Sequence, residues 1–283
     1  MKLGTWTILL WLRLAGMTVL AAWAQDPGPT SIPVKLKDGY LVVAKGSIGP
    51  LNDLTFLVDT GTSRTLIDSH IAKQLQLQGP GHKLTVFDHE VEAQLVVLPD
   101  LRLGAIHALS PHVIVTNLSS VAQNFGLHAD AVLGMDILHL GTFSIDYKSG
   151  RIWFGDSEPM ASVVPLEDGQ PYMILKARID DFSVSLMIDT GCDDVVLFAN
   201  RVPKGLKRGY FTESRALTFT EKAAPTQIGF GYLAVATSPA HKVKLKIIST
   251  GGNDMGYDGI VGMRALRASQ IRFNFGEMTV SWK

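Results

Sequence analysis

Two Asp-Thr-Gly triplets are the residues of this sequence with the clearest chemical potential. Asp59-Thr60-Gly61 follows the apolar run 56–58, and Asp189-Thr190-Gly191 follows the apolar run 186–188. A single triplet is weak evidence, because an Asp after a strand often forms a turn with its own backbone. Two carboxylates held close together, however, cannot both ionise at low cost, and such a pair shares one proton. If the two turns face each other, the aspartates can act as general acid and base on a water molecule.

The triplets belong to an internal repeat, which is the strongest pattern in the chain. Asp189 follows Asp59 at an offset of 189 − 59 = 130 residues. Residues 258–263 repeat residues 130–135 at an offset of 258 − 130 = 128, and residues 273–282 match residues 145–154 at the same offset. The repeat predicts two homologous domains, residues 25–157 and 158–283, that meet in the acidic, Pro-containing stretch 155–159.

Each half is predicted to be rich in β-structure. Short runs of Val, Leu and aromatic residues alternate with Gly, Asn, Asp and Pro turns, as strands joined by turns do. Residues 148–150 and 276–277 are predicted hairpin turns. Helical periodicity is confined to short pieces such as residues 68–77, which an Asp or Ser side chain can cap. The predicted strands of the first half are residues 40–44, 54–58, 90–98 and 112–116.

On these residues the chain resembles the aspartic proteases, in particular small retropepsin-like lobes fused in tandem. The resemblance covers about residues 31–283 and includes a second signature, Val132-Leu133-Gly134 and Ile260-Val261-Gly262. The two glycines follow their aspartates by similar distances, 134 − 59 = 75 and 262 − 189 = 73 residues. The resemblance implies an all-β, bilobal acid-protease fold of two barrel-like lobes with short helices. It also implies that Asp59 and Asp189 are the catalytic pair.

The resemblance assigns supporting roles to the residues around this pair. Thr60 and Thr190 are expected to hydrogen-bond across the axis between the lobes, and backbone N–H groups near Gly61 and Gly191 to hold the carboxylates. Gly134 and Gly262 are expected to let a supporting strand approach each loop, because glycine permits close backbone contact. Thr62 offers a hydroxyl to the outer oxygen of Asp59. Cys192 stands at the matching position of the second half, where its thiol is a weaker donor, so the aspartates are predicted to be inequivalent.

The function that follows is that of an aspartic endopeptidase, active at acidic pH and without a metal or organic cofactor. Substrates are expected to bind extended across a largely apolar cleft. Flap hairpins are predicted near residues 85–92 and within residues 210–231. A monomer that pairs its own halves is favoured over a homodimer. An alternative is a peptide-binding or scaffolding protein that kept the fold without turnover, since fold alone does not fix function.

The N-terminus predicts export. Residues 1–24 combine an early Lys with an apolar stretch and a small-residue ending, which is typical of a secretory signal peptide cleaved before Gln25. An uncleaved membrane anchor is the alternative, against which Arg13 argues. Cleavage changes the net charge from zero to 24 − 26 = −2, so a secreted or periplasmic protein without affinity for nucleic acid or for membranes is expected.

Other residues with chemical potential are given ordinary structural interpretations. The histidines between His82 and His139 show no metal-ligand spacing, and no metal site is predicted. Cys192 has no neighbouring His that could activate it as a nucleophile. The alternating lysines Lys242, Lys244 and Lys246 predict a solvated face or a protected edge of a strand.

Overall fold

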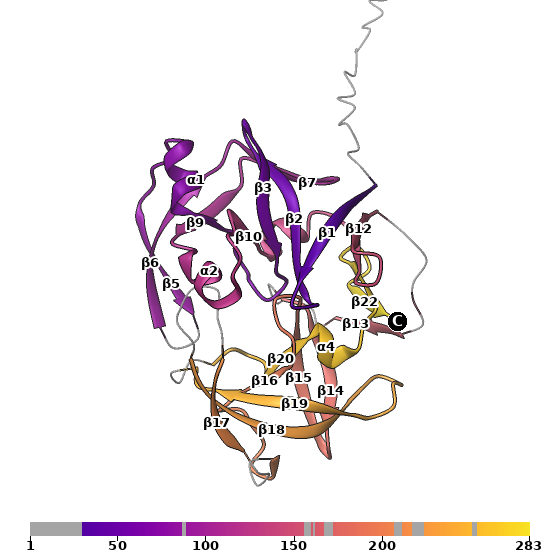
Figure 1. The fold of residues 1–283 in the computed structure, drawn as a ribbon. Helices are drawn as coiled ribbons and strands as arrows, with labels where there is room; N and C mark the ends of the chain where they lie inside the picture. The colour runs from indigo at the N-terminus through magenta and orange to yellow at the C-terminus, as the bar shows by residue number, and fades with distance from the viewer. Residues whose placement is uncertain are drawn as a thin grey trace, which may run out of the picture.

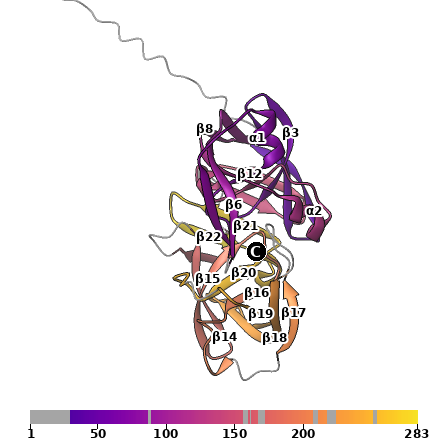
Figure 2. The same cartoon turned by 90° about the vertical axis from the view of Figure 1, so that its left-hand side faces the viewer.

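The computed structural model describes residues 30–86, 89–155, 160, 162–166, 172–206, 211–216, 224–250 and 254–283. The predicted signal segment and the predicted boundary between residues 157 and 158 lie outside these ranges. Strands dominate the described chain and its helices are short, so the all-β prediction is confirmed. Figure 1 shows the N-terminal half above the C-terminal half, and Figure 2 shows both from the side. The helices are α1 (Ser69–Gln74), α2 (Ser119–Phe125), α3 (Met135–Leu138) and α4 (Met263–Leu266).

The strands of the first half pack around β10, a short, fully buried strand that lies parallel to β3, with Leu133 opposite Val58. This pairing brings the supporting signature beside the strand that ends at Asp59. The sheet continues through β2 (Leu41–Ile48), β3 (Leu51–Val58), β10 (Ala131–Leu133), β4 (Leu66–Asp68), β9 (His112–Thr116), β6 (His89–Val97) and β5 (Gly81–Val86). The hairpin of β7 (Asp100–Leu103) and β8 (Ile106–Leu109) pairs with β2.

The second half repeats this arrangement. Its supporting strand β20 lies parallel to β15 and antiparallel to β16, with Gly262 opposite Asp189. The order of the sheet is β14 (Ile174–Ile179), β15 (Phe182–Asp189), β20 (Gly259–Gly262), β16 (Val195–Phe198), β19 (His241–Ile248), β18 (Ala224–Val235) and β17 (Thr212–Ala216). The sheet bends back on itself, because β18 also pairs with β14. In both halves, therefore, a buried parallel strand flanks the strand that delivers the aspartate.

A sheet with strands from both halves joins them. Its order is β13 (Ser162–Pro165), β22 (Thr279–Trp282), β21 (Gln270–Asn274), β11 (Phe143–Asp146), β12 (Arg151–Phe154) and β1 (Ser31–Lys37). In the central pair β11–β21, Phe143 lies opposite Phe273 and Ile145 opposite Ile271. The offset of 128 residues exchanges these two pairs, so the register is symmetric about Ser144 and Arg272. The predicted turns at 148–150 and 276–277 connect β11 to β12 and β21 to β22.

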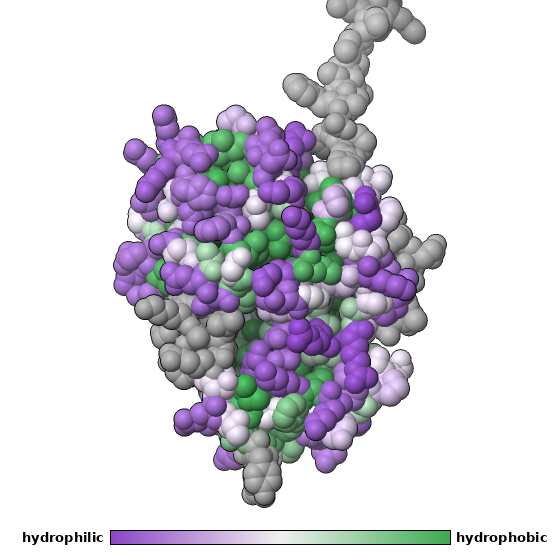
Figure 3. Space-filling model, viewed as in Figure 1, coloured by the Kyte–Doolittle hydropathy of each residue, from purple (hydrophilic) through white to green (hydrophobic). Residues whose placement is uncertain are grey.

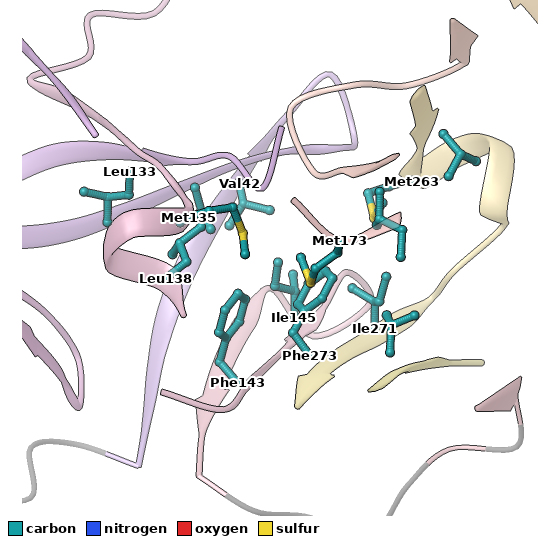
Figure 4. Packing of buried hydrophobic residues seen from close by; sticks show 14 of the residues in the cluster. Val42, Leu133, Met135, Leu138, Phe143, Ile145, Met173, Met263, Ile271 and Phe273 are labelled. Carbon is teal, nitrogen blue, oxygen red and sulfur yellow. The ribbon is translucent and has the colours of Figure 1, made fainter. Parts of the chain in front are cut away.

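The hydrophobic core runs between the halves as well as within them. Figure 4 shows side chains from β11, β21, α3 and α4 packed together, with Met135 and Met263 following the two supporting glycines. The ring centroids of Phe143 and Phe273 are 5.1 Å apart. Burial of this apolar surface from both halves provides the main driving force for holding them together. The loops that carry the two aspartates thus rest on a continuous core.

The local predictions are confirmed at α1 and are partly wrong at the lysines. Helix α1 begins after Asp68, whose carboxylate accepts a hydrogen bond from the His70 N–H at 2.9 Å, as the expected cap does. Strand β19, which carries the alternating lysines, lies inside its sheet between β16 and β18 and not at an edge. The Lys246 side chain is only 16% exposed and forms ion pairs, so it is not a solvated residue. Lys242, in contrast, is exposed.

The surface drawn in Figure 3 is mainly hydrophilic, with small separated hydrophobic areas. On β18 the exposed Phe230 lies beneath Lys242, whose Nζ is 4.8 Å from the ring centroid. Among the helices in the described ranges, none has the length and apolar character that crossing a membrane requires.

Candidate active site

Each Asp-Thr-Gly loop leaves the end of a strand and is held by the strand parallel to it. The Asp59 N–H donates to the Leu133 carbonyl at 3.0 Å, and the Met135 N–H donates to the Thr62 carbonyl at 2.8 Å. In the second half the Met263 N–H donates to the Cys192 carbonyl at 3.1 Å. The supporting strands therefore fix both loops through backbone hydrogen bonds at matching positions.

Gly134 and Gly262 lie where these backbones come closest. A Cβ atom at Gly134 would stand 2.7 Å from the Thr62 carbonyl oxygen, and one at Gly262 would stand 2.5 Å from the carbonyl carbon of Cys192. Side-chain carbons do not approach other atoms so closely, and backbone atoms cannot rotate out of the way. Both glycines are placed as the sequence predicts, against the loops that carry the aspartates.

Thr60 and Thr190 connect the two loops. The Thr60 hydroxyl donates to the Ile188 carbonyl at 2.9 Å and accepts from the Thr190 N–H at 3.1 Å. The Thr190 hydroxyl does the reciprocal, donating to the Val58 carbonyl at 2.8 Å and accepting from the Thr60 N–H at 3.1 Å. Both residues are fully buried. These four hydrogen bonds fix the two loops to each other, as the sequence predicts.

The structure brings the Asp59 and Asp189 carboxyl groups face to face. They lie within hydrogen-bonding reach of each other, and burial together with the Asp59 charge raises the pKa of Asp189 well above its ordinary value. Gly61 belongs to the same contact, since a Cβ there would lie 2.5 and 2.7 Å from the two carboxylate oxygens of Asp189. A pair of acids in this geometry holds one proton between them over a wide pH range.

The two carboxyl groups have different hydrogen-bond donors. Asp59 accepts from the Gly61 N–H at 2.8 Å and from the Thr62 hydroxyl at 2.6 Å. Asp189 accepts from the Gly191 N–H at 2.6 Å. The Cys192 thiol points away from it and donates to the Asp194 carbonyl at 3.4 Å. The predicted inequivalence is therefore present in the geometry, and the additional hydroxyl favours the charged form of Asp59.

The comparison with known families gives the same assignment for the first half. Residues 44–137 match the aspartyl protease family. The matched segment begins in β2, includes Asp59-Thr60-Gly61 and the supporting Gly134, and ends within α3. A search of curated proteins finds no match. The family recognised from the sequence is confirmed by this segment, and the second half enters the comparison through its geometry.

Two aspartates of this aspartyl protease have a role that sequence reasoning missed. Asp130 and Asp258 begin the repeated segments at the supporting strands, and each accepts a backbone N–H of the strand that leads to a triplet. Thr55 donates to Asp130 at 2.6 Å and Ser185 donates to Asp258 at 2.8 Å. The repeat at an offset of 128 contained this signal, because the same acid recurs at matching places in both halves.

A pair of tyrosines next to the site was not predicted either. Tyr172 and Tyr257 pack edge to face with ring centroids 5.9 Å apart, and burial raises the pKa of both hydroxyls. The Tyr172 hydroxyl hydrogen-bonds to Ser63 of the other half and lies close enough to Asp59 and Asp189 to feel their charges. The Tyr257 hydroxyl donates to the Met187 sulfur at 3.4 Å. No motif in the sequence marks these tyrosines, because only the packing of the halves brings them here.

The histidines lie elsewhere in this protease. His70 contacts Asp68 and Asp130 at 2.7 and 2.9 Å, and His107 contacts Asp100 at 3.2 Å. Over the described part of the chain, no group of three or more His, Cys, Asp and Glu side chains is arranged to hold a metal ion. A cavity of about 400 Å³ beside α3 includes Arg64, His107, His112 and Asp136 in its lining but neither aspartate of the triplets.

Proposed function

We propose that the protein is an aspartic endopeptidase in which Asp59 and Asp189 are the catalytic residues. The observation that carries the proposal is the direct contact of the two carboxyl groups, with the pKa of Asp189 raised well above its ordinary value. Asp59 is buried, whereas Asp189 keeps some solvent-accessible surface through which water and a peptide can reach the pair. The aspartyl protease match over residues 44–137 supports the same reaction class.

The geometry assigns a starting role to each carboxyl group. Asp59 begins ionised and takes a proton from a water molecule, whose oxygen attacks the peptide carbonyl carbon. Asp189 begins protonated and donates its proton to the carbonyl oxygen, so the intermediate is a neutral geminal diol. The diol collapses when Asp59 returns its proton to the amide nitrogen, the C–N bond breaks and Asp189 recovers a proton from one hydroxyl. The pair is then ready for another cycle, without a covalent acyl-enzyme.

We further propose that the active unit is a monomer of two duplicated domains, residues 25–157 and 158–283. The hydrogen bonds between Thr60 and Thr190 and the symmetric register of β11 and β21 support pairing within one chain over a homodimer. Export by the N-terminal segment 1–24 and work outside the cytoplasm remain proposals from the sequence. The hairpins β5–β6 and β17–β18 are proposed to act as flaps over a bound peptide.

The decisive experiment is digestion of an unfolded protein by residues 25–283 at about pH 4–6, with the products identified by mass spectrometry. We expect cleavage between hydrophobic residues. We also expect inhibition by a peptide in which a tetrahedral carbinol replaces the scissile carbonyl, because such a group resembles the transition state. The absence of cleavage across the whole acidic range would contradict the proposal.

A peptide-binding protein without turnover is the second candidate, and the orientation of Cys192 favours it. Its thiol gives no hydrogen bond to Asp189, so the second carboxyl lacks the donor that Thr62 supplies to the first. This candidate predicts that the carbinol peptide binds but that no peptide bond is cut. The same digestion and binding experiments therefore separate the two functions.

Replacing Cys192 with Ser tests the inequivalence of the two aspartates. A Ser hydroxyl that turns toward Asp189 donates a hydrogen bond to its charged form, which lowers the raised pKa of that carboxyl. Because the active form carries one shared proton, the alkaline limb of the pH–rate profile is expected to move to lower pH. The measurement is kcat/KM against pH, with Cys192→Ala as the control that removes the thiol without adding a hydroxyl. An alkaline limb that is unchanged in the Ser variant would contradict the prediction.

A further inference from the structure

The loop that carries Asp189 continues into two acidic residues, Asp193 and Asp194, and both face the same lysine. The Lys246 ammonium lies 2.9 Å from Asp193 Oδ1 and 3.0 Å from Asp194 Oδ2. Lys244, two residues earlier on β19, lies 3.5 Å from the same Asp194 oxygen. The loop is thus tied by ion pairs to a strand more than fifty residues away in the chain.

These ion pairs are largely shielded from water. The side chains of Lys246, Asp193 and Asp194 are 16%, 22% and 11% exposed. Burial opposes the charge on both partners, yet the mutual hydrogen bond and charge hold the pKa of Asp193 below and that of Lys246 above their ordinary values. Removal of one partner from a buried pair leaves the other as an uncompensated charge, which is strongly destabilising. Without Lys246, two acids next to Asp189 would therefore be driven toward solvent.

The first half holds the equivalent loop without a lysine. There the Asp136 carboxylate accepts hydrogen bonds from the Thr65 N–H at 2.9 Å and from the Thr65 hydroxyl at 2.7 Å. The strand registers pair Ile67 with Val115 in the first half and Val196 with Lys246 in the second. Val115 thus occupies the position of Lys246. The ionic anchor is therefore a special feature of the Asp189 loop and not a general requirement of the fold.

Arg264 holds the same loop from the other side and connects it to the first half. Its guanidinium lies 3.9 Å from Asp193 Oδ2, donates to the Asp38 carbonyl at 3.1 Å and stacks 5.8 Å from the ring centroid of Tyr40. Arg264 is exposed, whereas Lys246 is not, so Lys246 forms the stronger attachment.

We propose that Lys246 is the positioning residue of the Asp189 loop: by binding Asp193 and Asp194 it keeps Asp189 opposite Asp59. Lys246 touches neither the substrate nor the reacting atoms and acts through the loop. The activity part of this inference rests on the proposed function, whereas the structural part does not. The two parts therefore have separate measurements.

Cys192 provides the structural measurement, because it is the single cysteine of the chain and lies inside this loop. Burial and the nearby Asp189 and Asp193 charges raise the pKa of its thiol well above the ordinary value, so it reacts slowly while the loop is in place. In Lys246→Met we expect the rate of Cys192 modification by an aromatic disulfide reagent to rise by about tenfold or more, because the loop opens more often. Lys246→Arg should remain close to the wild-type rate. Lys242→Met is the matched control, since Lys242 is an exposed residue of the same strand.

The second measurement separates positioning from general stability. In Lys246→Met we expect kcat to fall about tenfold or more with KM nearly unchanged, because a displaced Asp189 affects chemistry and not the extended peptide contacts. Lys246→Arg should recover most of kcat. Cys192 modification and kcat that both match the wild type in a folded Lys246→Met variant would overturn the inference. If Cys192 becomes exposed in a protein whose wild type cleaves nothing, the loop anchor stands and the proposed function fails.

Discussion

Asp189→Asn is expected to lower kcat by about a thousandfold or more while the fold is retained. An amide has nearly the shape of the carboxyl group and can still accept the Gly191 N–H at Asp189 Oδ1. It cannot release a proton to the substrate carbonyl, and that step has no other donor in the proposed mechanism. Asp59→Asn should have an effect of similar size, because it removes the base that activates water. The measurement is initial-rate hydrolysis of a peptide substrate at the optimal pH of the wild type.

The same substitution is expected to make the fold less sensitive to rising pH. The pKa of Asp189 is raised in the folded protein, so the folded state binds a proton more tightly than the unfolded state does. This carboxyl group therefore contributes stability at low pH, and the contribution is lost as pH rises from the ordinary carboxyl value through the raised pKa. Asn does not titrate and lacks this loss. The free energy of unfolding in urea should shift in favour of the Asn variant as pH rises.

Asp181→Asn is the control for both measurements, because Asp181 is an exposed acid in the second half away from the triplet. It should leave kcat and the pH dependence of unfolding close to those of the wild type. Activity that survives in both Asp59→Asn and Asp189→Asn would place the chemistry in other residues and end the dyad mechanism.

Gly262→Ala is expected to have the second large effect, a loss of about 3 kcal/mol in the free energy of unfolding together with most of the activity. The new Cβ would lie 2.5 Å from both the carbonyl carbon and the carbonyl oxygen of Cys192 and 2.6 Å from the carbonyl carbon of Asp193. All three atoms belong to the backbone, so relief requires the supporting strand and the Asp189 loop to separate. That separation also breaks the Met263 N–H to Cys192 carbonyl hydrogen bond.

Gly276→Ala separates this contact from the general cost of replacing glycine. Gly276 lies in the turn between β21 and β22, its φ is not in the left-handed region, and the nearest atom to an added Cβ is 3.5 Å away. Its variant should unfold within about 0.5 kcal/mol of the wild type. Equal stability of Gly262→Ala and Gly276→Ala, measured by denaturant unfolding, would refute the tight contact at Gly262.

The sequence determined the main parts of the candidate site because they are local or repeated. The Asp-Thr-Gly turn, the preceding apolar strand and the glycine of the supporting strand each require particular residues at short spacing, and each occurs twice. The repeat at 128–130 residues then predicted which parts correspond. It also marked Asp130 and Asp258, whose hydrogen bonds to the strands leading to the triplets became evident only in the structure.

Only the tertiary structure decided how side chains distant in sequence meet around Asp189. The Cys192 thiol turns toward the Asp194 carbonyl, Lys246 is drawn inward by two acids, and the Tyr172 hydroxyl reaches Ser63 in the other half. An alternating lysine pattern indicates that side chains share one face of a strand, but it does not reveal whether an acid covers that face. Hydrophobic burial between the halves selects these contacts, and its energy depends on packing in three dimensions, which spacing along the chain does not encode.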